Sequence, residues 1–189
     1  VRNLDVVGMG EEGQLRLLAS SVIVIGAGGL GSAVLPYLAA AGVGRIAVVD
    51  GDAVELKNMQ RQVLHTELGR NKAESAAERL GLLNPDVQVE IDTTYLTRAR
   101  AKALFPRYDL VLDCTDTFDA KFMIADAAAA VIASASSAVE DTRTTSIPLG
   151  SGAVTCAATS VTDAPRRAAA RASRSSRERS THSSARGSL

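Results

Sequence analysis

The chain of 189 residues lacks the features that mark several specialised classes of protein. Its two cysteines, Cys114 and Cys156, are too few for a disulfide framework or a four-thiolate zinc site. No uninterrupted apolar run reaches the roughly 18 residues typical of a membrane-spanning helix. The first residues do not form a signal-peptide pattern. We therefore expect a cytoplasmic protein with no membrane partner.

A net charge is also lacking, because 21 basic residues balance 21 acidic ones. The balance hides an uneven distribution. Residues 164–189 contain seven arginines and one glutamate, so residues 1–163 carry a net charge of −6. A mildly acidic folded part gives no reason to expect nucleic-acid binding. The scattered arginines beyond it are typical of a solvated run.

The most informative segment is GAGGLG at residues 26–31, which follows a β-branched run and precedes an apolar helical stretch. Gly26 and Gly28 allow the backbone to turn tightly and approach a phosphate, and Gly31 allows the helix to pack closely on the strand. The helix N-terminus then offers free N–H groups to an anion. Asp50, 24 residues after Gly26, stands where a carboxylate can accept hydrogen bonds from a ribose.

Strands alternate with helices through the first two thirds of the chain. The patterns predict strands at 22–25, 45–50, 87–91 and 108–114, and helices at 11–20, 29–41, 70–83, 97–105 and 118–130. This alternation indicates an α/β protein with a doubly wound, mostly parallel Rossmann-like sheet that has helices on both faces.

The character of the chain changes after about residue 131, where alanine, serine, threonine and arginine dominate. We expect a nucleotide-binding domain at 1–131, an irregular segment at 132–163 and a disordered tail at 164–189, because the tail offers little apolar surface to offset the entropy of ordering. The sheet would then be incomplete on its C-terminal side.

Polar residues gather where the second and fourth strands end. Arg61 can present its fork of donors to a phosphate, and Lys72 can neutralise a triphosphate. Asp116, after the fourth strand, can hold Mg²⁺ beside such phosphates. Each has a simpler explanation, because Lys72 could be a solvated surface lysine and Arg61 or Asp116 a helix cap. A glycine fingerprint alone is most typical of NAD or FAD binding.

The combined segments GAGGLG, VVDGDAVELKNMQRQVLH, NKAESA and YDLVLDCTD resemble the ThiF/MoeB/HesA adenylyltransferases, relatives of ubiquitin-activating enzymes. The resemblance covers residues 2–130. It implies ATP and Mg²⁺ as cofactors. It also implies a reaction in which the C-terminal carboxylate of a small ubiquitin-like sulfur carrier, ending in Gly-Gly, attacks the α-phosphate. The products would be an acyl-adenylate and pyrophosphate.

The same resemblance assigns residues to roles. The implied catalytic residues are Arg2, Arg61, Lys72 and Asp116, with Asp116 linked to Mg²⁺ and Arg2 reaching the ATP of a partner subunit in a homodimer. The implied nucleotide-binding residues are Gly26, Gly28, Gly29, Gly31, Asp50, Lys57, Asn58, Met59, Gln60, Arg61, Lys72, Asp116 and Thr117. Lys57 and Met59 stand where the family more often has serine and leucine. The attacking carboxylate is already ionised at neutral pH, so no general base is needed. His65 is therefore given no catalytic role and is expected to be packed or exposed near Arg61.

The resemblance fades in the carboxyl half, where we expect a further strand, a carrier-binding region and Cys-x-x-Cys pairs and find none in the sequence. No zinc is therefore expected. We interpret the residues after about 131 as a truncation, a reading-frame change or a degraded gene. Two alternatives to the adenylyltransferase stay open: a remnant that only binds ATP, and, ranked lower, a fragment of an NAD-dependent oxidoreductase.

Overall fold

The computed structural model describes residues 2–136, and the surroundings of side chains within residues 4–134. The predicted irregular segment and disordered tail, with the proposed frame change, fall almost wholly outside the described residues. The domain boundary at residue 131 stays a prediction. Among residues 2–136, no helix combines the length and the apolar character that crossing a bilayer requires.

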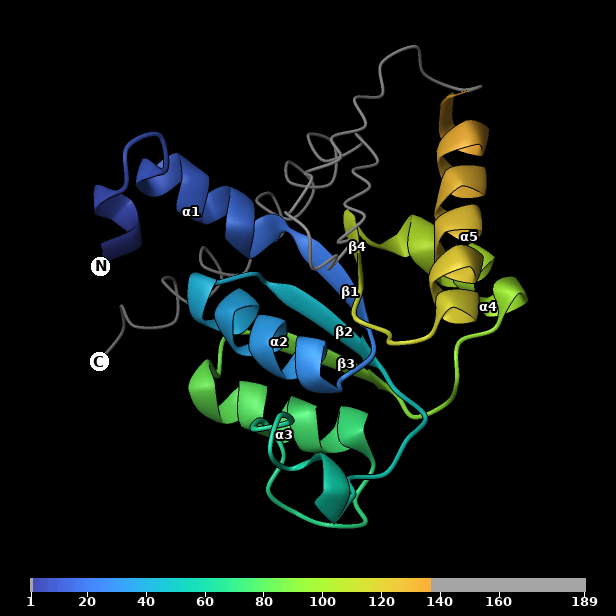
Figure 1. The fold of residues 1–189 in the computed structure, drawn as a ribbon. Helices are drawn as coiled ribbons and strands as arrows, with labels where there is room; N and C mark the ends of the chain where they lie inside the picture. Colours follow the sequence, from blue (N-terminus) through green and yellow to red (C-terminus); the bar gives the residue numbers. More distant parts are fainter. Residues whose placement is uncertain (1, 137–189) are drawn as a thin grey trace, which may run out of the picture.

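Four parallel strands form the sheet of the described chain, in the order β3-β2-β1-β4 (Figure 1). Their bounds are β1 Ser21–Ile25, β2 Arg45–Val49, β3 Gln88–Asp92 and β4 Leu110–Asp113. β1 lies between β2 and β4, and all five of its residues are buried. A strand covered on both faces reads as a continuous apolar run, which explains the sequence of β1.

Helices cover the two faces of the sheet. Successive side chains of β1 point to opposite faces, so they contact different helices. Helices α2 and α3 lie on one side of the sheet and α4 and α5 on the other (Figure 1). Val22 and Val24 pack in one core with α2 and α3, whereas Ile23 and Ile25 pack in a second core with α4 and α5. The helices are α1 Gly10–Ala19, α2 Gly29–Ala41, α3 Lys72–Leu83, α4 Arg98–Leu104 and α5 Phe118–Ser136. The predicted α/β architecture is confirmed.

Helix boundaries follow local capping. The Asn71 side chain accepts hydrogen bonds from the amides of Ala73 and Glu74, so α3 begins at Lys72, two residues after the predicted start. Thr97 is the N-cap of α4, and its side chain accepts a hydrogen bond from the amide of Arg100. The prediction for the end of α5 was wrong, because the helix continues to Ser136, past residue 130. The alanine-rich sequence there favours helix and contains no glycine or proline to end it.

Two glycines of the segment 26–31 are required by close contacts. Gly26 has φ of 96°, and a Cβ there would lie 2.8 Å from the carbonyl oxygen of Cys114. A Cβ on Gly31 would lie 2.3 Å from the carbonyl oxygen of Gly26. Gly26 therefore lets the turn after β1 pass close to the backbone just after β4, and Gly31 lets the first turn of α2 lie directly against the end of β1.

Substitution of Gly31 by alanine is expected to lower the free energy of unfolding by about 1–3 kcal/mol, because α2 must move away from the backbone of Gly26. Urea denaturation followed by circular dichroism measures the change. Gly81→Ala in α3 is the matched control, since a Cβ there meets nothing within 4 Å and alanine favours a helix interior. Equal stability of the Gly31 and Gly81 variants would contradict the packing argument.

Candidate functional site

A cavity of about 700 Å³ opens at the carboxyl ends of the parallel strands. Its wall includes Ile25 at the end of β1, Val49 at the end of β2 and Cys114 just after β4. The loop after β3 and the first residues of α3 and α5 complete it. Ligands of open α/β sheets bind at this edge, where the strand order reverses.

The glycine segment and the N-terminus of α2 form one side of the cavity. Gly28 is the N-cap of α2 and, having no side chain, provides no capping hydrogen bond. The first N–H groups of a helix have no intrahelical partner, and they carry the positive end of the helix dipole. Gly28 and Gly29 both line the cavity. This end of α2 can therefore receive an anion.

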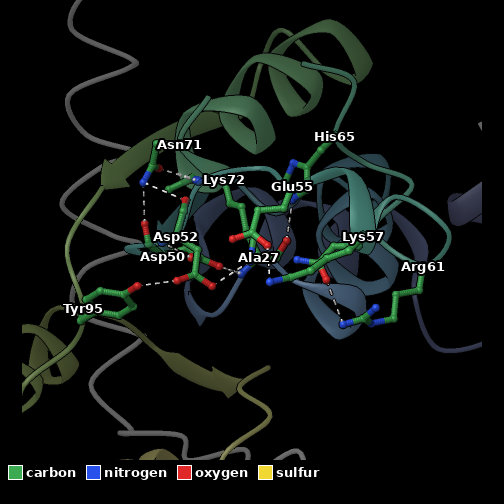
Figure 2. A network of polar contacts seen from close by, with 12 residues as sticks. Ala27, Asp50, Asp52, Glu55, Lys57, Arg61, His65, Asn71, Lys72 and Tyr95 are labelled. Atoms are coloured by element: carbon green, nitrogen blue, oxygen red, sulfur yellow. Dashed lines mark hydrogen bonds and ion pairs between the residues drawn. The ribbon is translucent and has the colours of Figure 1, made fainter. Parts of the chain in front are cut away.

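Asp50, directly after β2, is held by two backbone amides. Its Oδ2 accepts a hydrogen bond from the amide of Ala27 at 2.7 Å, and its Oδ1 accepts one from the amide of Asp52 at 2.8 Å (Figure 2). The first bond joins the end of β2 to the glycine segment after β1. Each carboxylate oxygen has a second acceptor site, so Asp50 can also accept from a ligand in the cavity.

Lys72 lies at the start of α3 with only 5% of its surface exposed. Its Nζ donates to Oδ2 of Asp52 at 2.8 Å, and the hydroxyl of Tyr95 donates to the other oxygen of the same carboxylate (Figure 2). The hydrogen bond from Lys72, followed by that from Tyr95, holds the pKa of Asp52 below its ordinary value of 3.8. All three residues line the cavity. Asp52 therefore supplies the counter-charge that keeps a buried ammonium group at the wall.

Arg61 lies at a different part of the wall, beside the glycine segment. Its guanidinium donates to Oδ1 of Asn58 at 3.3 Å, and its aliphatic part passes within 3.6 Å of where a Cβ of Gly29 would be. The Arg61 side chain is exposed. The cation is therefore supported by Asn58, close to the N-terminus of α2, with no acidic partner among the described side chains.

Asp116 follows β4 and lines the cavity with an exposed side chain. Its carboxylate makes no hydrogen bond or ion pair within the described part of the chain. The possibility that Asp116 caps α5 is wrong, because Thr117 takes that place and accepts from the amide of Ala120. No group of three or more His, Cys, Asp or Glu side chains that could hold a metal occurs within the residues described.

The structure brings most, but not all, of the predicted site residues to this cavity. Those that line it are Gly26, Gly28, Gly29, Asp50, Arg61, Lys72, Asp116 and Thr117. Those that do not are Gly31, Lys57, Asn58, Met59 and Gln60. Lys57 instead pairs with Glu55 at 2.6 Å on the surface. Arg2 belongs to the 3-10 helix η1, Arg2–Asp5, and its side chain lies outside the described residues.

Sequence reasoning assigned no site role to three residues that help to form the wall. Asp52 and Tyr95 hold Lys72 as described above, and Gln62 is 4% exposed with its Oε1 unpartnered among the described atoms. A Cβ on Gly28 would lie 3.5 Å from Nε2 of Gln62. Gln62 was recognisable as part of the polar loop after β2. For Tyr95 no signal existed, because its position depends on how the loop after β3 folds back.

A parallel sheet of this order, with a glycine segment after β1 and an acidic residue after β2, defines a Rossmann-like α/β protein in which the N-terminus of α2 can receive an anion. The chain belongs to the ThiF family, whose model matches residues 1–184.

Known proteins similar to the chain include two bacterial relatives. The chain is 46% identical over 129 residues to the probable adenylyltransferase/sulfurtransferase MoeZ of Mycobacterium tuberculosis, covering 67% of this chain and 33% of MoeZ. It is 48% identical over 129 residues to the sulfur carrier protein adenylyltransferase of Thermus thermophilus, covering 67% of this chain and 48% of that protein. The chain thus spans between a third and a half of the length of these two relatives.

Among solved structures, the chain is similar to the tRNA N6-threonylcarbamoyladenosine dehydratase TcdA of E. coli in complex with ATP. The TM-score is 0.54 and the sequence identity 33%, with 57% of this chain and 46% of TcdA covered. This similarity agrees with the Rossmann-like sheet described above.

Replacement of Asp52 by asparagine is expected to destabilise the fold at pH 6 by about 1–2 kcal/mol, since Lys72 loses its counter-charge while Asp52 itself is half-exposed. A carboxyl group with a lowered pKa stabilises the folded state above its unfolded pKa. That contribution is lost as the pH falls below 3.8 towards the folded pKa. The difference between wild type and D52N should therefore shrink as the pH falls below 3.8.

Urea denaturation of both proteins between pH 2.5 and 7 measures this dependence. Asp86→Asn is the control, because the Asp86 carboxylate is exposed and has no partner within the described chain. A stability difference between D52N and wild type that is constant over this pH range would contradict the ion-pair explanation.

Proposed function

We propose that this chain binds ATP in the cavity and adenylates the C-terminal carboxylate of a small ubiquitin-like sulfur carrier that ends in Gly-Gly. The observation that carries the proposal is the convergence of an uncapped helix N-terminus, Asp50, Arg61, Lys72 and Asp116 on one cavity. The names of MoeZ and of the Thermus relative, and the ATP bound to TcdA, support it. The molybdopterin and thiamine pathways both use carriers of this type.

The residues present fit a nucleotide. The N-terminus of α2 suits a phosphate, and the remaining acceptor capacity of Asp50 suits ribose hydroxyls. Leu96, Met123 and Ile124 give the cavity an apolar part that suits a base. The Asp116 carboxylate suits Mg²⁺, which proteins bind through one or two carboxylates together with substrate phosphates. Bound there, Mg²⁺ would neutralise phosphate charge.

In the proposed reaction an oxygen of the carrier carboxylate forms a bond to the α-phosphorus, and the bond to the departing pyrophosphate breaks. The carboxylate is ionised at neutral pH, so no side chain has to remove a proton. Negative charge develops on the phosphates, and the positive charges of Arg61 and Lys72 stabilise it from fixed positions. Asp52 holds the Lys72 ammonium in place. The protein thus contributes positioning and charge.

A homodimer is part of the proposal. The resemblance to the family places Arg2 at the ATP of the partner subunit, where it would add a third positive charge. The observed η1 helix carries Arg2 on the N-terminal side of α1. Lys57, Asn58, Met59 and Gln60 remain proposed phosphate contacts, and of these Asn58 has a visible role in supporting Arg61.

Asp116→Asn is expected to weaken ATP binding in the presence of Mg²⁺ by at least about tenfold and to leave binding in EDTA unchanged. Isothermal titration calorimetry with and without Mg²⁺ gives both affinities. Asp119→Asn is the matched control, because Asp119 is exposed in the first turn of α5 and does not line the cavity. Equal Mg²⁺-dependent affinities of wild type and D116N would remove Asp116 from the site.

Arg61→Ala should slow carrier-dependent exchange of pyrophosphate into ATP by about 10²–10³-fold, since one fixed positive charge on the reacting phosphates is lost. Radioactive pyrophosphate and a carrier ending in Gly-Gly provide the assay. Arg79→Ala, on the exposed surface of α3, should have the wild-type rate.

The exchange assay, together with measurements of ATP and NADH binding, separates the remaining functions. ATP binding by the wild-type chain without any exchange would favour a protein that only binds the nucleotide. Tight binding of NADH in place of ATP would favour an oxidoreductase fragment.

A further inference from the structure

His65 is buried behind the glycine segment, with 1% of its surface exposed, and does not line the cavity. Its Nε2 lies 2.7 Å from the carbonyl oxygen of Ala27, and its Nδ1 lies 3.0 Å from Oγ of Ser75 in α3. Figure 2 shows the imidazole joined to the Ala27 carbonyl. The sequence left open whether His65 is packed or exposed; the structure shows it packed, with a specific hydrogen-bond partner at each ring nitrogen.

The two contacts define where the imidazole proton lies. A carbonyl oxygen can only accept, so Nε2 carries the hydrogen and donates it to Ala27. In the neutral ring Nδ1 is then an acceptor, and the Ser75 hydroxyl donates to it. Burial lowers the pKa of His65, which favours the neutral ring near pH 7. The Ala27 carbonyl therefore selects the tautomer, and the Ser75 hydroxyl, which can donate or accept, completes the hydrogen bonding of the ring.

The bond to Ala27 has a consequence on the other side of the backbone. The carbonyl of Ala27 and the N–H of Gly28 belong to one planar peptide unit, and no cis bond occurs in the described chain. In a trans peptide these two groups point in opposite directions. The carbonyl points to His65, outside the cavity wall, and the N–H of Gly28 therefore points away from His65. Gly28 itself lines the cavity.

The preceding peptide is fixed as well, because the N–H of Ala27 donates to Asp50 at 2.7 Å. Ala27 has no exposed surface, so neither of its polar groups has water as an alternative partner. The glycine segment is thus held from two sides, by a carboxylate after β2 and by an imidazole before α3. Without the imidazole donor, the peptide between Ala27 and Gly28 would lose the hydrogen bond that fixes the direction of its carbonyl.

We propose that His65 is a positioning residue that orients the Gly28 amide towards a bound phosphate through the carbonyl of Ala27. The identity of the anion as a nucleotide phosphate rests on the proposed function. The orientation of the amide does not. His65 acts on recognition of the phosphate and leaves the binding of base and ribose to other parts of the cavity.

His65→Leu removes the donor while keeping a side chain of comparable bulk, and His65→Gln keeps an N–H that can replace Nε2. We expect H65L to weaken ATP binding about tenfold or more and adenosine binding less than about twofold, because only ATP presents phosphates to the amide. H65Q should keep ATP affinity within about threefold of wild type. Calorimetry gives the affinities, and thermal denaturation monitors folding.

A second measurement uses the protein without nucleotide. In ¹⁵N-labelled wild type, a spectrum of the imidazole nitrogens should show Nε2 protonated and Nδ1 unprotonated. The Gly28 amide resonance should move in H65L and return towards its wild-type position in H65Q. Failure of the wild type to bind ATP would refute the proposed function, while these spectra would still decide the role of His65. If H65L fails to fold, the imidazole spectrum of the wild type still tests the tautomer on which the role of His65 depends.

Three results would overturn the inference. One is protonation at Nδ1 in the wild type. Another is an unchanged Gly28 amide resonance in H65L. The third is an equal loss of ATP and adenosine affinity in H65L, which would mean that His65 supports the fold in general and has no specific effect on the phosphate.

Discussion

The hydrogen bond from the Ala27 amide to the Asp50 carboxylate fixes the geometry on which the whole site depends. It joins the turn after β1 to the end of β2, the two strands whose register runs from Ser21 opposite Arg45 to Ile25 opposite Val49. Because the strands are parallel and paired over their full length, a bond at their ends leaves the glycine segment little freedom. The N-terminus of α2 then takes a fixed direction relative to Lys72 and Arg61.

The fold was predictable because its determinants are local. Buried strands read as β-branched runs, and the glycine segment allows contacts that a Cβ would prevent. The start of α3 was predicted two residues too early, because Asn71 is its N-cap. The predicted strands and α2 agree with the structure to within about two residues, a deviation typical of element ends. The end of α5 was misjudged, because an alanine-rich helix can stop anywhere that packing no longer supports it.

The site was predictable only in part. Residues whose roles follow from their place at a strand end, such as Asp50 and Asp116, lie at the cavity as expected. Contacts between distant segments were not predictable, because they depend on tertiary packing. The partner of Lys72 is Asp52, 20 residues earlier, and Tyr95 reaches that carboxylate from 43 residues later. His65, 38 residues from Ala27, offered no pattern from which its hydrogen bond could be inferred.

The cavity wall is contributed by segments that follow β1, β2, β3 and β4, and these segments lie far apart along the chain. A molecule that fills the cavity contacts all of them at once, and unfolding of any one strand destroys its binding site. Occupancy is therefore coupled thermodynamically to the integrity of the entire sheet, and it stabilises the folded state by about RT ln(1 + [L]/Kd). Regions distant from the cavity, such as the opposite end of β1, share in that stabilisation.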